Sequence, residues 1–208
     1  MPTPRRMDAK TRDNSTYATL PGQCHITRAD YARYFGRSFV ERRWRYLSSF
    51  LPFAWHRIPL LNGGLNWLRM KEWFQYGDTN PTIVLDSKRR LVATYTALDT
   101  GLQHRFTVIR VIGEKLQLIR GGVHDGQRFA SVSSYRRGKD SERLGRWETF
   151  TPIVIDCMSR DAELCEKMKA RIPASHWTAL EIGLKQISHP PKAGLYDIVL
   201  PEDLRRLL

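Results

Sequence analysis

Residues 91–112, LVATYTALDTGLQHRFTVIRVI, hold two β-prone runs, 91–98 and 106–112, on either side of a turn at 99–101. Valine, isoleucine, threonine and aromatic residues dominate both runs and alternate with a period near two, which is typical of strands. Similar runs lie at residues 82–85, 116–119, 128–135 and 152–156. Several short strands at this spacing predict an antiparallel sheet curled into a barrel or half-barrel.

Two helices are predicted after these strands. Ser159 is the expected N-cap of the first, which has acidic residues in its first turn and basic residues near its end. Trp177, Leu180, Leu184 and Ile187 form the apolar face of the second. A closing strand is expected at 194–200, and a turn of helix follows it. Trp147 and Trp177 are both expected in the core. The predicted fold class is therefore α+β, in which an antiparallel barrel-like sheet carries two inserted C-terminal helices, and residues 78–208 form this domain.

A basic helical segment is predicted before the sheet, at residues 27–77. Thr27 and Asp30 have the spacing of a capping box, and aromatic residues follow at helical spacing, which predicts a helix over about 28–50. Prolines and the pair Gly63-Gly64 then separate a shorter helix at 65–76. Residues 1–26 are polar and are expected to be a flexible basic arm.

Composition narrows the class of protein. The chain has 208 residues, 41% of them hydrophobic, which is enough to form a buried core and excludes a wholly disordered chain. Its formal net charge is +13, which favours an anionic partner. Three cysteines without a CxxC pair, and a basic start with no apolar stretch behind it, predict a cytoplasmic protein.

Most of the positive charge lies near the N-terminus. Residues 1–77 hold thirteen basic and five acidic residues. Arginines interleaved with aromatic residues suit phosphate contacts combined with base stacking. A solvated helix face is the alternative, because Glu41 can pair with arginines one turn away on either side. The candidate residues for binding an anionic partner in this segment are Arg37, Arg42, Arg43, Trp44 and Arg45.

A second basic group lies in the loop after the run at 128–135. Arg136, Arg137 and Lys139 are its candidate binding residues, and Arg143 and Arg146 follow. A loop of this length between strands is either mobile or functional.

Signatures of catalysis or of metal binding are missing from the sequence. GxSxG, GxxxxGK[ST] and GxGxxG do not occur, and the histidines and cysteines form no close pair of the kind that zinc sites use. His124-Asp125 could include a general base, but its glycine-rich surroundings favour a tight turn. We therefore predict no cofactor, no metal and no catalytic residue, and whether the protein is an enzyme stays open.

Residues 78–200 resemble a bacterial family of uncharacterised proteins grouped as a domain of unknown function. The resemblance rests on residue type and spacing in LVATYTALDTG at 91–101, GQRFASVSSY at 126–135, and Trp147 with Phe150-Thr-Pro152. It implies a bacterial protein that is cytoplasmic or close to a membrane. Because the family has no assigned chemistry, the resemblance supplies no functional residues.

The sequence thus predicts a non-enzymatic binding module that docks an anionic partner, with RNA or DNA backbone favoured. An acidic protein partner and an enzyme whose site is assembled from scattered residues stay open. Peripheral attachment to an anionic membrane surface is a further alternative. Its interfacial anchors would be Trp44, Phe50, Phe53, Trp55 and Trp67.

Overall fold

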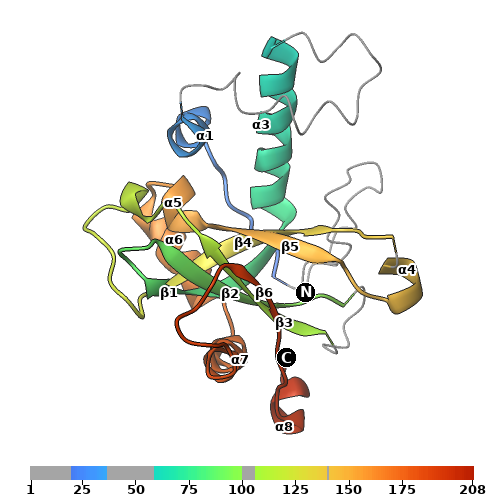
Figure 1. Cartoon of the computed structure of the whole chain (residues 1–208). Helices are drawn as coiled ribbons and strands as arrows, with labels where there is room; N and C mark the ends of the chain where they lie inside the picture. The colour runs from blue at the N-terminus through green and yellow to red at the C-terminus, as the bar shows by residue number, and fades with distance from the viewer. Residues whose placement is uncertain (1–19, 37–58, 100–105, 140) are drawn as a thin grey trace.

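Strands β2 (Leu91–Ala97) and β3 (Thr107–Gly113) form an antiparallel pair at the centre of the fold, in register from Leu91 opposite Gly113 to Ala97 opposite Thr107. The computed structural model describes residues 20–36, 59–99, 106–139 and 141–208. These residues form a six-stranded sheet in the order β5-β4-β1-β2-β3-β6. The sheet is antiparallel and curls into a half-barrel (Figure 1), which confirms the predicted fold class. The other strands are β1 (Asp78–Asp86), β4 (Arg128–Arg136), β5 (Thr149–Val154) and β6 (Gly194–Asp197).

Helices lie around this sheet and near its ends (Figure 1). In the described part of the chain they are α1 (Arg28–Phe35), α3 (Pro59–Tyr76), α4 (Ser141–Leu144), α5 (Ile155–Met158), α6 (Ala162–Ala170), α7 (Ala174–Leu184), α8 (Glu202–Arg205) and the 3-10 turn η2 (Leu116–Leu118). Helices α6 and α7 lie between β5 and β6 in the chain, as the sequence predicted. Among the described residues, none of the helices combines the length and the apolar character needed to cross a bilayer.

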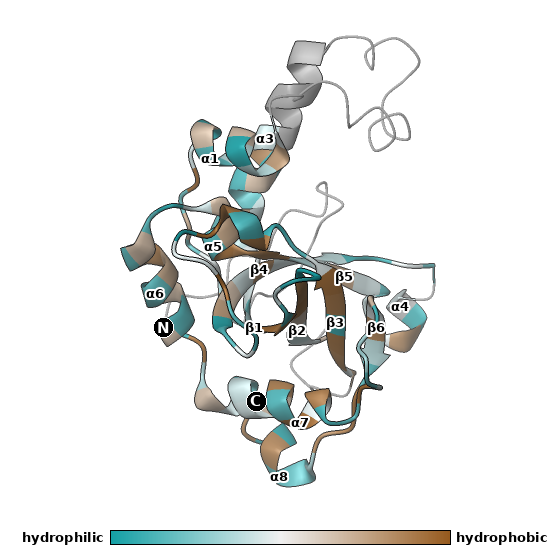
Figure 2. Ribbon diagram, turned by 60° about the vertical axis from the view of Figure 1, so that its left-hand side comes forward, coloured by the Kyte–Doolittle hydropathy of each residue, from teal (hydrophilic) through white to brown (hydrophobic). Residues whose placement is uncertain are grey.

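Helix α7 covers one face of the sheet. Leu180 of α7 belongs to the same buried cluster as Tyr95 and Ile109, and Figure 2 colours β3 as hydrophobic beside this helix. Gly183 permits this close approach, since a Cβ there would lie 2.6 Å from the Cδ1 atoms of both Ile109 and Ile198. Trp147 is buried as predicted, whereas Trp177 at the start of α7 is only partly buried, which corrects the second part of that prediction.

The opposite face carries a buried band of hydroxyl groups. Thr82 of β1 lies between Thr94 of β2 and Ser131 of β4, and its Oγ1 is 2.8 Å from the hydroxyl oxygen of each. The hydroxyls of Thr96 and Tyr135 lie 2.6 Å apart, and Tyr135 also donates to Asp78 at 3.0 Å. Because buried hydroxyls are costly without partners, this network fixes the strand register.

Helices α1 and α3 share a core with the sheet. Tyr31 and Tyr34 of α1 and Phe74 of α3 lie in the same buried cluster as Val132 of β4 and Ile155 of α5. The chain before α1 is tied to the end of α3 by backbone hydrogen bonds, such as the one that Cys24 N donates to Phe74 O at 3.0 Å. The predicted division at residue 77 therefore falls within a continuous core. That residues 80–200 form a stable domain without the N-terminal helices stays a prediction.

Helix α1 begins as predicted and ends early. Thr27 and Asp30 form the capping box, with Thr27 Oγ1 accepting from Asp30 N at 3.1 Å and Asp30 accepting from Thr27 N at 3.0 Å. The predicted helix over 28–50 is wrong at its end, because α1 stops at Phe35. Gly36 follows with φ 84°, a left-handed backbone conformation that favours glycine and ends helices. Residues 37–58 lie outside the described residues.

Other elements also differ from prediction. Helix α3 begins at Pro59 rather than at residue 65, since proline is compatible with the first helical position. The strand predicted at 116–119 is η2. The strand predicted at 152–156 is β5, which begins at Thr149 and gives way to α5 at Ile155.

The predicted N-cap of α6 is also corrected. Ser159 ends α5 instead, because its N–H bonds Ile155 O at 2.7 Å and its hydroxyl accepts from Asp161 N at 3.1 Å. The N-cap of α6 is Asp161, whose carboxylate accepts from Leu164 N at 3.0 Å.

Candidate functional site

The predicted anion-binding residues divide between two parts of the chain. The first group lies outside the described residues and consists of Arg37, Arg42, Arg43, Trp44 and Arg45. The second group is described. Arg136 is the last residue of β4, and Arg137 and Lys139 lie between it and α4, all three exposed.

Two arginines of this second region form ion pairs. Arg136 Nε lies 3.2 Å from Glu148 Oε2, and Arg146 Nη2 lies 2.9 Å from Asp197 Oδ1. The Arg146 guanidinium also lies over the Phe106 ring, 5.3 Å from its centroid. Much of the charge of Arg136 and Arg146 is therefore already balanced within the fold.

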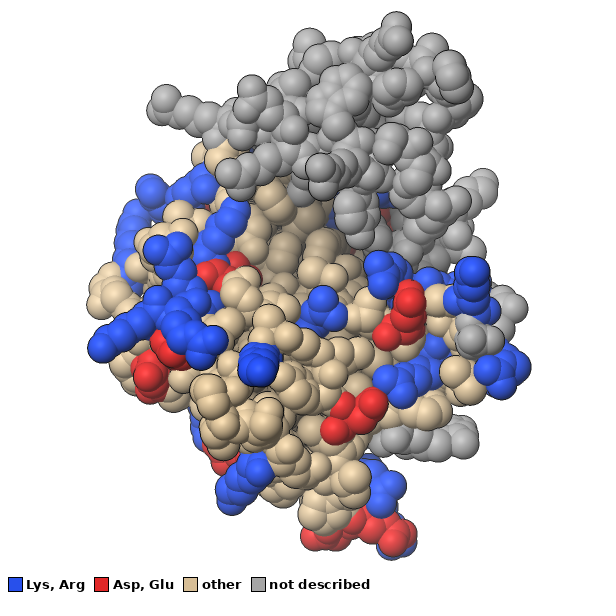
Figure 3. Space-filling model, in the orientation of Figure 1, with Lys and Arg blue, Asp and Glu red and all other residues tan. Residues whose placement is uncertain are grey.

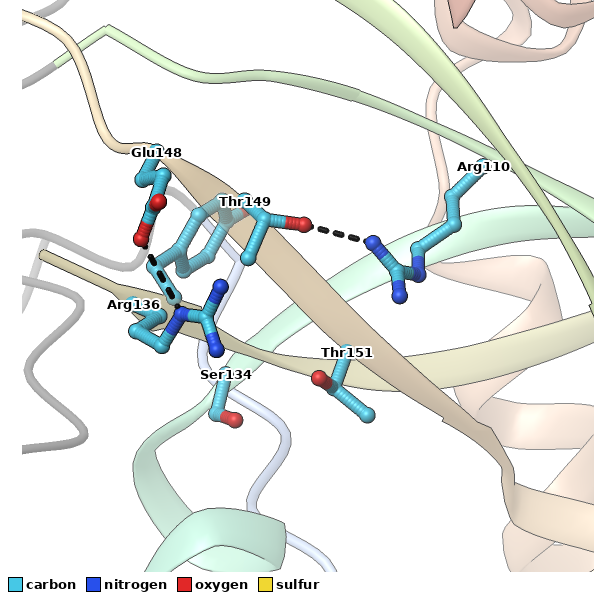
Figure 4. Close-up of a pocket in the computed structure, with 7 residues that line it drawn as sticks. Arg110, Ser134, Arg136, Glu148, Thr149 and Thr151 are labelled. Carbon is cyan, nitrogen blue, oxygen red and sulfur yellow. Dashed lines mark hydrogen bonds and ion pairs between the residues drawn. The ribbon is translucent and has the colours of Figure 1, made fainter. Parts of the chain in front are cut away.

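A polar pocket adjoins Arg136 and is lined by residues of β3, β4 and β5 and by Glu148 (Figure 4). Its volume is about 480 Å³. Register places Ser134 opposite Thr151 and Arg136 opposite Thr149, so these four side chains share one face of the two strands. Arg110 reaches the pocket from β3 and donates Nη1 to Thr149 Oγ1 at 2.5 Å. We call this site the β4–β5 pocket.

A third group of cations, which the sequence analysis missed, consists of Arg33, Arg120 and Arg160, and we call it the Arg33 cluster. Arg33 lies on α1, Arg120 follows η2, and Arg160 lies between α5 and α6. In Figure 3, which has the orientation of Figure 1, basic side chains gather on the left, the side on which α1, α5 and α6 lie. Arg120 and Arg160 are exposed and form no ion pair within the described residues.

Arg33 holds α1 against the two chain segments that carry Arg120 and Arg160. It donates Nη1 to Leu118 O at 3.1 Å and Nη2 to Met158 O at 2.7 Å. Burial lowers the pKa of the Arg33 guanidinium, and the charge of Arg160 and then of Arg120 lowers it further, while Asp30 acts in the opposite direction. Backbone carbonyl groups thus accept from both terminal nitrogens of Arg33, while its Nε is buried without a hydrogen-bond partner. The positive charge of Arg33 adds to that of the two exposed arginines.

A buried carboxylate fixes the other side of α1. Glu114 accepts hydrogen bonds from Tyr34 Oη at 2.8 Å, Lys115 N at 2.7 Å and Val154 N at 3.2 Å. Lys115 Nζ donates to Tyr34 O and lies 4.3 Å from the centroid of the Tyr34 ring. Burial raises the pKa of Glu114, and these hydrogen bonds and the Lys115 charge oppose that rise. Its position in the core makes Glu114 an anchor for α1.

The cysteines are unsuited to nucleophilic chemistry. Cys24, Cys157 and Cys165 are all buried free thiols. Burial raises the pKa of Cys24 and of Cys165 to about 12, and it raises the pKa of Cys157 further. A thiol with so high a pKa holds little thiolate at neutral pH. In the described ranges, no group of histidine, cysteine and acidic residues could hold a metal ion.

His124 and Asp125 lie in a turn, as their glycine-rich surroundings favoured. Asp125 Oδ1 accepts from Ser87 N at 2.7 Å, and Gly126 has φ 80°. The Asp125 carboxylate is thus used to join two turns.

Comparison with known proteins gives a family and a distant structural neighbour. A family model described as "Protein of unknown function (DUF3239)" matches residues 67–188. Among curated proteins, none matches the chain. A solved structure described as a "putative membrane protein from Corynebacterium diphtheriae" has 17% sequence identity and a TM-score of 0.47, and the match covers 58% of this chain and 100% of that one.

Proposed function

The chain belongs to this family of proteins of unknown function, and we propose that it is a non-enzymatic binding module that docks the phosphate backbone of a nucleic acid. The Arg33 cluster is the observation that carries the proposal. Three separate segments bring these guanidinium groups close enough for the charges of Arg160 and Arg120 to lower the pKa of Arg33, and Arg120 and Arg160 have no carboxylate partner among the described residues. Exposed arginines without counter-charges are suited to bind phosphate oxygens.

Continuity with the N-terminal arginines extends this surface. Helix α1 carries Arg33 and ends at Phe35, and the chain then runs directly into Arg37, Arg42, Arg43 and Arg45. In the sequence, the arginine-rich segment therefore begins four residues after Arg33. A linear polyanion can engage both groups of cations along its length, as a small anion cannot.

Among the described residues, the aromatic side chains offer little support for a membrane anchor. An aromatic interfacial anchor needs a side chain that is free to enter the lipid. Of the five candidate anchors, Trp44, Phe50, Phe53 and Trp55 lie outside the described residues. Trp67 is partly buried and packs edge-on against Tyr31, with ring centroids 5.8 Å apart. In the described part of the chain, the exposed large hydrophobic residues are scattered over different elements and loops and include no aromatic residue: Leu68, Leu144, Val199 and Leu207.

The test is binding of labelled RNA and DNA to the full chain and to a variant that carries both Arg120→Gln and Arg160→Gln. Glutamine keeps much of the aliphatic stem and removes the charge. The parent should bind with an affinity that falls linearly with salt on a double logarithmic plot, between about 0.05 and 0.2 M. Losing two phosphate contacts should reduce the magnitude of that slope by about 1.5.

A matched control removes the same charge elsewhere. Lys185 and Arg205 are exposed, form no ion pair among the described residues, and lie at the ends of α7 and α8. The variant with Lys185→Gln and Arg205→Gln should keep the parental slope. An equal reduction of the slope in both variants would mean that the Arg33 cluster is not a specific binding site. Binding to phosphatidylcholine–phosphatidylserine vesicles without binding to nucleic acid would reject the proposal in favour of a membrane surface.

A further inference from the structure

The β4–β5 pocket has an excess of positive charge. Two guanidinium groups, from Arg110 and Arg136, enter it, and Glu148 is the carboxylate among its lining residues. Glu148 pairs with Arg136, and Arg110 forms no ion pair within the described residues. Burial lowers the pKa of Arg110, and the positive charge of Arg136 lowers it further.

The donors of Arg110 are only partly used. Nη1 donates to Thr149, whereas Nε is buried without a hydrogen-bond partner. Figure 4 shows the guanidinium groups of Arg110 and Arg136 turned toward one another across the space between Thr149 and Thr151. A half-buried arginine with an unpaired donor is costly unless an acceptor is supplied. An anion in this space would supply an acceptor to the accessible part of the Arg110 guanidinium.

Hydroxyl groups complete the set of donors. Ser134 and Thr151 stand opposite each other on β4 and β5, on the same face as Arg136 and Thr149. Arginine forks and hydroxyls together match the several oxygens of a tetrahedral oxyanion. The volume of about 480 Å³ exceeds what a lone phosphate needs and lies in the range of small-molecule sites.

We propose that the β4–β5 pocket binds the phosphate group of a small phosphomonoester with a polar body. Arg110 and Arg136 hold the phosphate oxygens from two sides, and Ser134 and Thr151 donate to the remaining oxygens. Glu148 competes with the ligand for Arg136 and therefore weakens binding. This site is distinct from the Arg33 cluster, and neither proposal depends on the other.

The experiment measures binding of glycerol 2-phosphate, glucose 6-phosphate and inorganic phosphate to the full chain by calorimetry, at constant ionic strength. Both phosphomonoesters should bind saturably, and unphosphorylated glycerol and glucose should not bind. Inorganic phosphate that binds as tightly as the esters would show that the pocket recognises phosphate alone and would overturn the phosphomonoester assignment. Affinity should rise with pH through about 6, where the second phosphate proton dissociates.

Three substitutions make the assignment specific. Arg136→Gln should weaken phosphomonoester binding about tenfold or more, because it removes a charge-assisted hydrogen bond. Thr151→Val changes an exposed residue and should weaken binding severalfold in a folded protein. Glu148→Gln should strengthen binding severalfold, a gain that a purely structural role for this ion pair would not produce.

The control is Arg146→Gln, which removes an equal charge from a residue that pairs with Asp197 and does not line the pocket. It should leave phosphomonoester affinity within about twofold of the parent, a free-energy change of about 0.4 kcal/mol. Equal losses for Arg136→Gln and Arg146→Gln would overturn the proposal, as would the absence of saturable binding to the parent. If Glu148→Gln weakens binding, the assigned roles of the charges are wrong.

Discussion

The hydroxyl of Tyr34 donates a 2.8 Å hydrogen bond to Glu114, which lies 80 residues further along the chain. Both residues are buried. This bond joins α1 to the segment that follows β3, and Val154 N at the end of β5 donates to the second oxygen of the same carboxylate. A single side chain thus holds three parts of the fold together and places Arg33, one residue before Tyr34, next to Arg120 and Arg160.

Tyr34→Phe should destabilise the protein by about 1–3 kcal/mol, because it leaves a buried carboxylate with one partner fewer while preserving the ring. Urea denaturation should show a lower midpoint with an unchanged slope. Tyr196→Phe is the control, since its hydroxyl donates to Lys192 O at an exposed position. That control should change stability by less than about 0.5 kcal/mol. Equal stability of Tyr34→Phe and the parent would show that the bond does not anchor α1.

The raised pKa of Glu114 predicts a pH dependence of stability with a definite sign. Between the ordinary carboxyl pKa and the higher pKa of the folded state, the folded chain holds more protons than the unfolded chain. The contribution of Glu114 to stability therefore falls as pH rises through this interval, by up to about 1.4 kcal/mol per pH unit. The measurement is the stability of the parent minus that of Glu114→Gln, followed from acid to neutral pH. A difference that grows with pH would contradict the assignment.

Gly183→Ala should destabilise the protein by about 1–2 kcal/mol, although alanine is the better helix former by about 0.5–1 kcal/mol. The added methyl group would meet Ile109 and Ile198 at 2.6 Å. Thermal unfolding measures the effect. Gly113→Ala is the matched control, because no atom lies within 4 Å of a Cβ built there. A double variant with Ile109→Val should recover part of the loss, and stabilisation by Gly183→Ala alone would mean that α7 lies further from the sheet.

Trp147→Ala should cost about 3–5 kcal/mol, as is usual for a buried tryptophan. Trp147 is 6% exposed and packs near Tyr135, with ring centroids 6.2 Å apart. Trp177→Ala should cost less, because Trp177 is partly buried and has the Arg128 guanidinium above its ring, 5.1 Å from the centroid. Denaturant titration gives the free energy of unfolding of each variant. A larger loss of stability for Trp177→Ala than for Trp147→Ala would mean that Trp177, and not Trp147, is the more deeply buried residue.

Strand alternation made most of the sheet predictable, while helix boundaries depended on local hydrogen bonds that residue types leave ambiguous. Ser159 and Asp161 are both good caps, and the fold uses the first to end α5 and the second to begin α6. Gly36 has the residue type of a helix end, yet apolar residues beyond it continued the pattern. The 116–119 segment has strand-like composition and forms η2, where Leu116 is buried and no strand partner is needed.

In the candidate sites, too, some residues could be predicted from the sequence and others are brought together only by the fold. Arg136 could be predicted because it belongs to a group of basic residues that are close together in the sequence. Arg110 was hidden because the residues on either side of it in β3 are apolar, and only the curl of the sheet brings it to Thr149. The Arg33 cluster was hidden because its three members are far apart in the chain and meet only after α1 has docked.

The curl of the sheet also bears on self-association. An open sheet ends in two strands whose unpaired backbone groups can recruit a strand from another molecule. Here β5 and β6 are the terminal strands, and side chains tie them back to the same sheet: Arg110 of β3 reaches β5, and Arg146, just before β5, reaches Asp197 of β6. The backbone of Trp147 also donates to Leu98 O at 2.7 Å. These contacts hold the two edges of the sheet against their own molecule, and covering an edge in this way is one means by which proteins avoid edge-to-edge pairing with another chain.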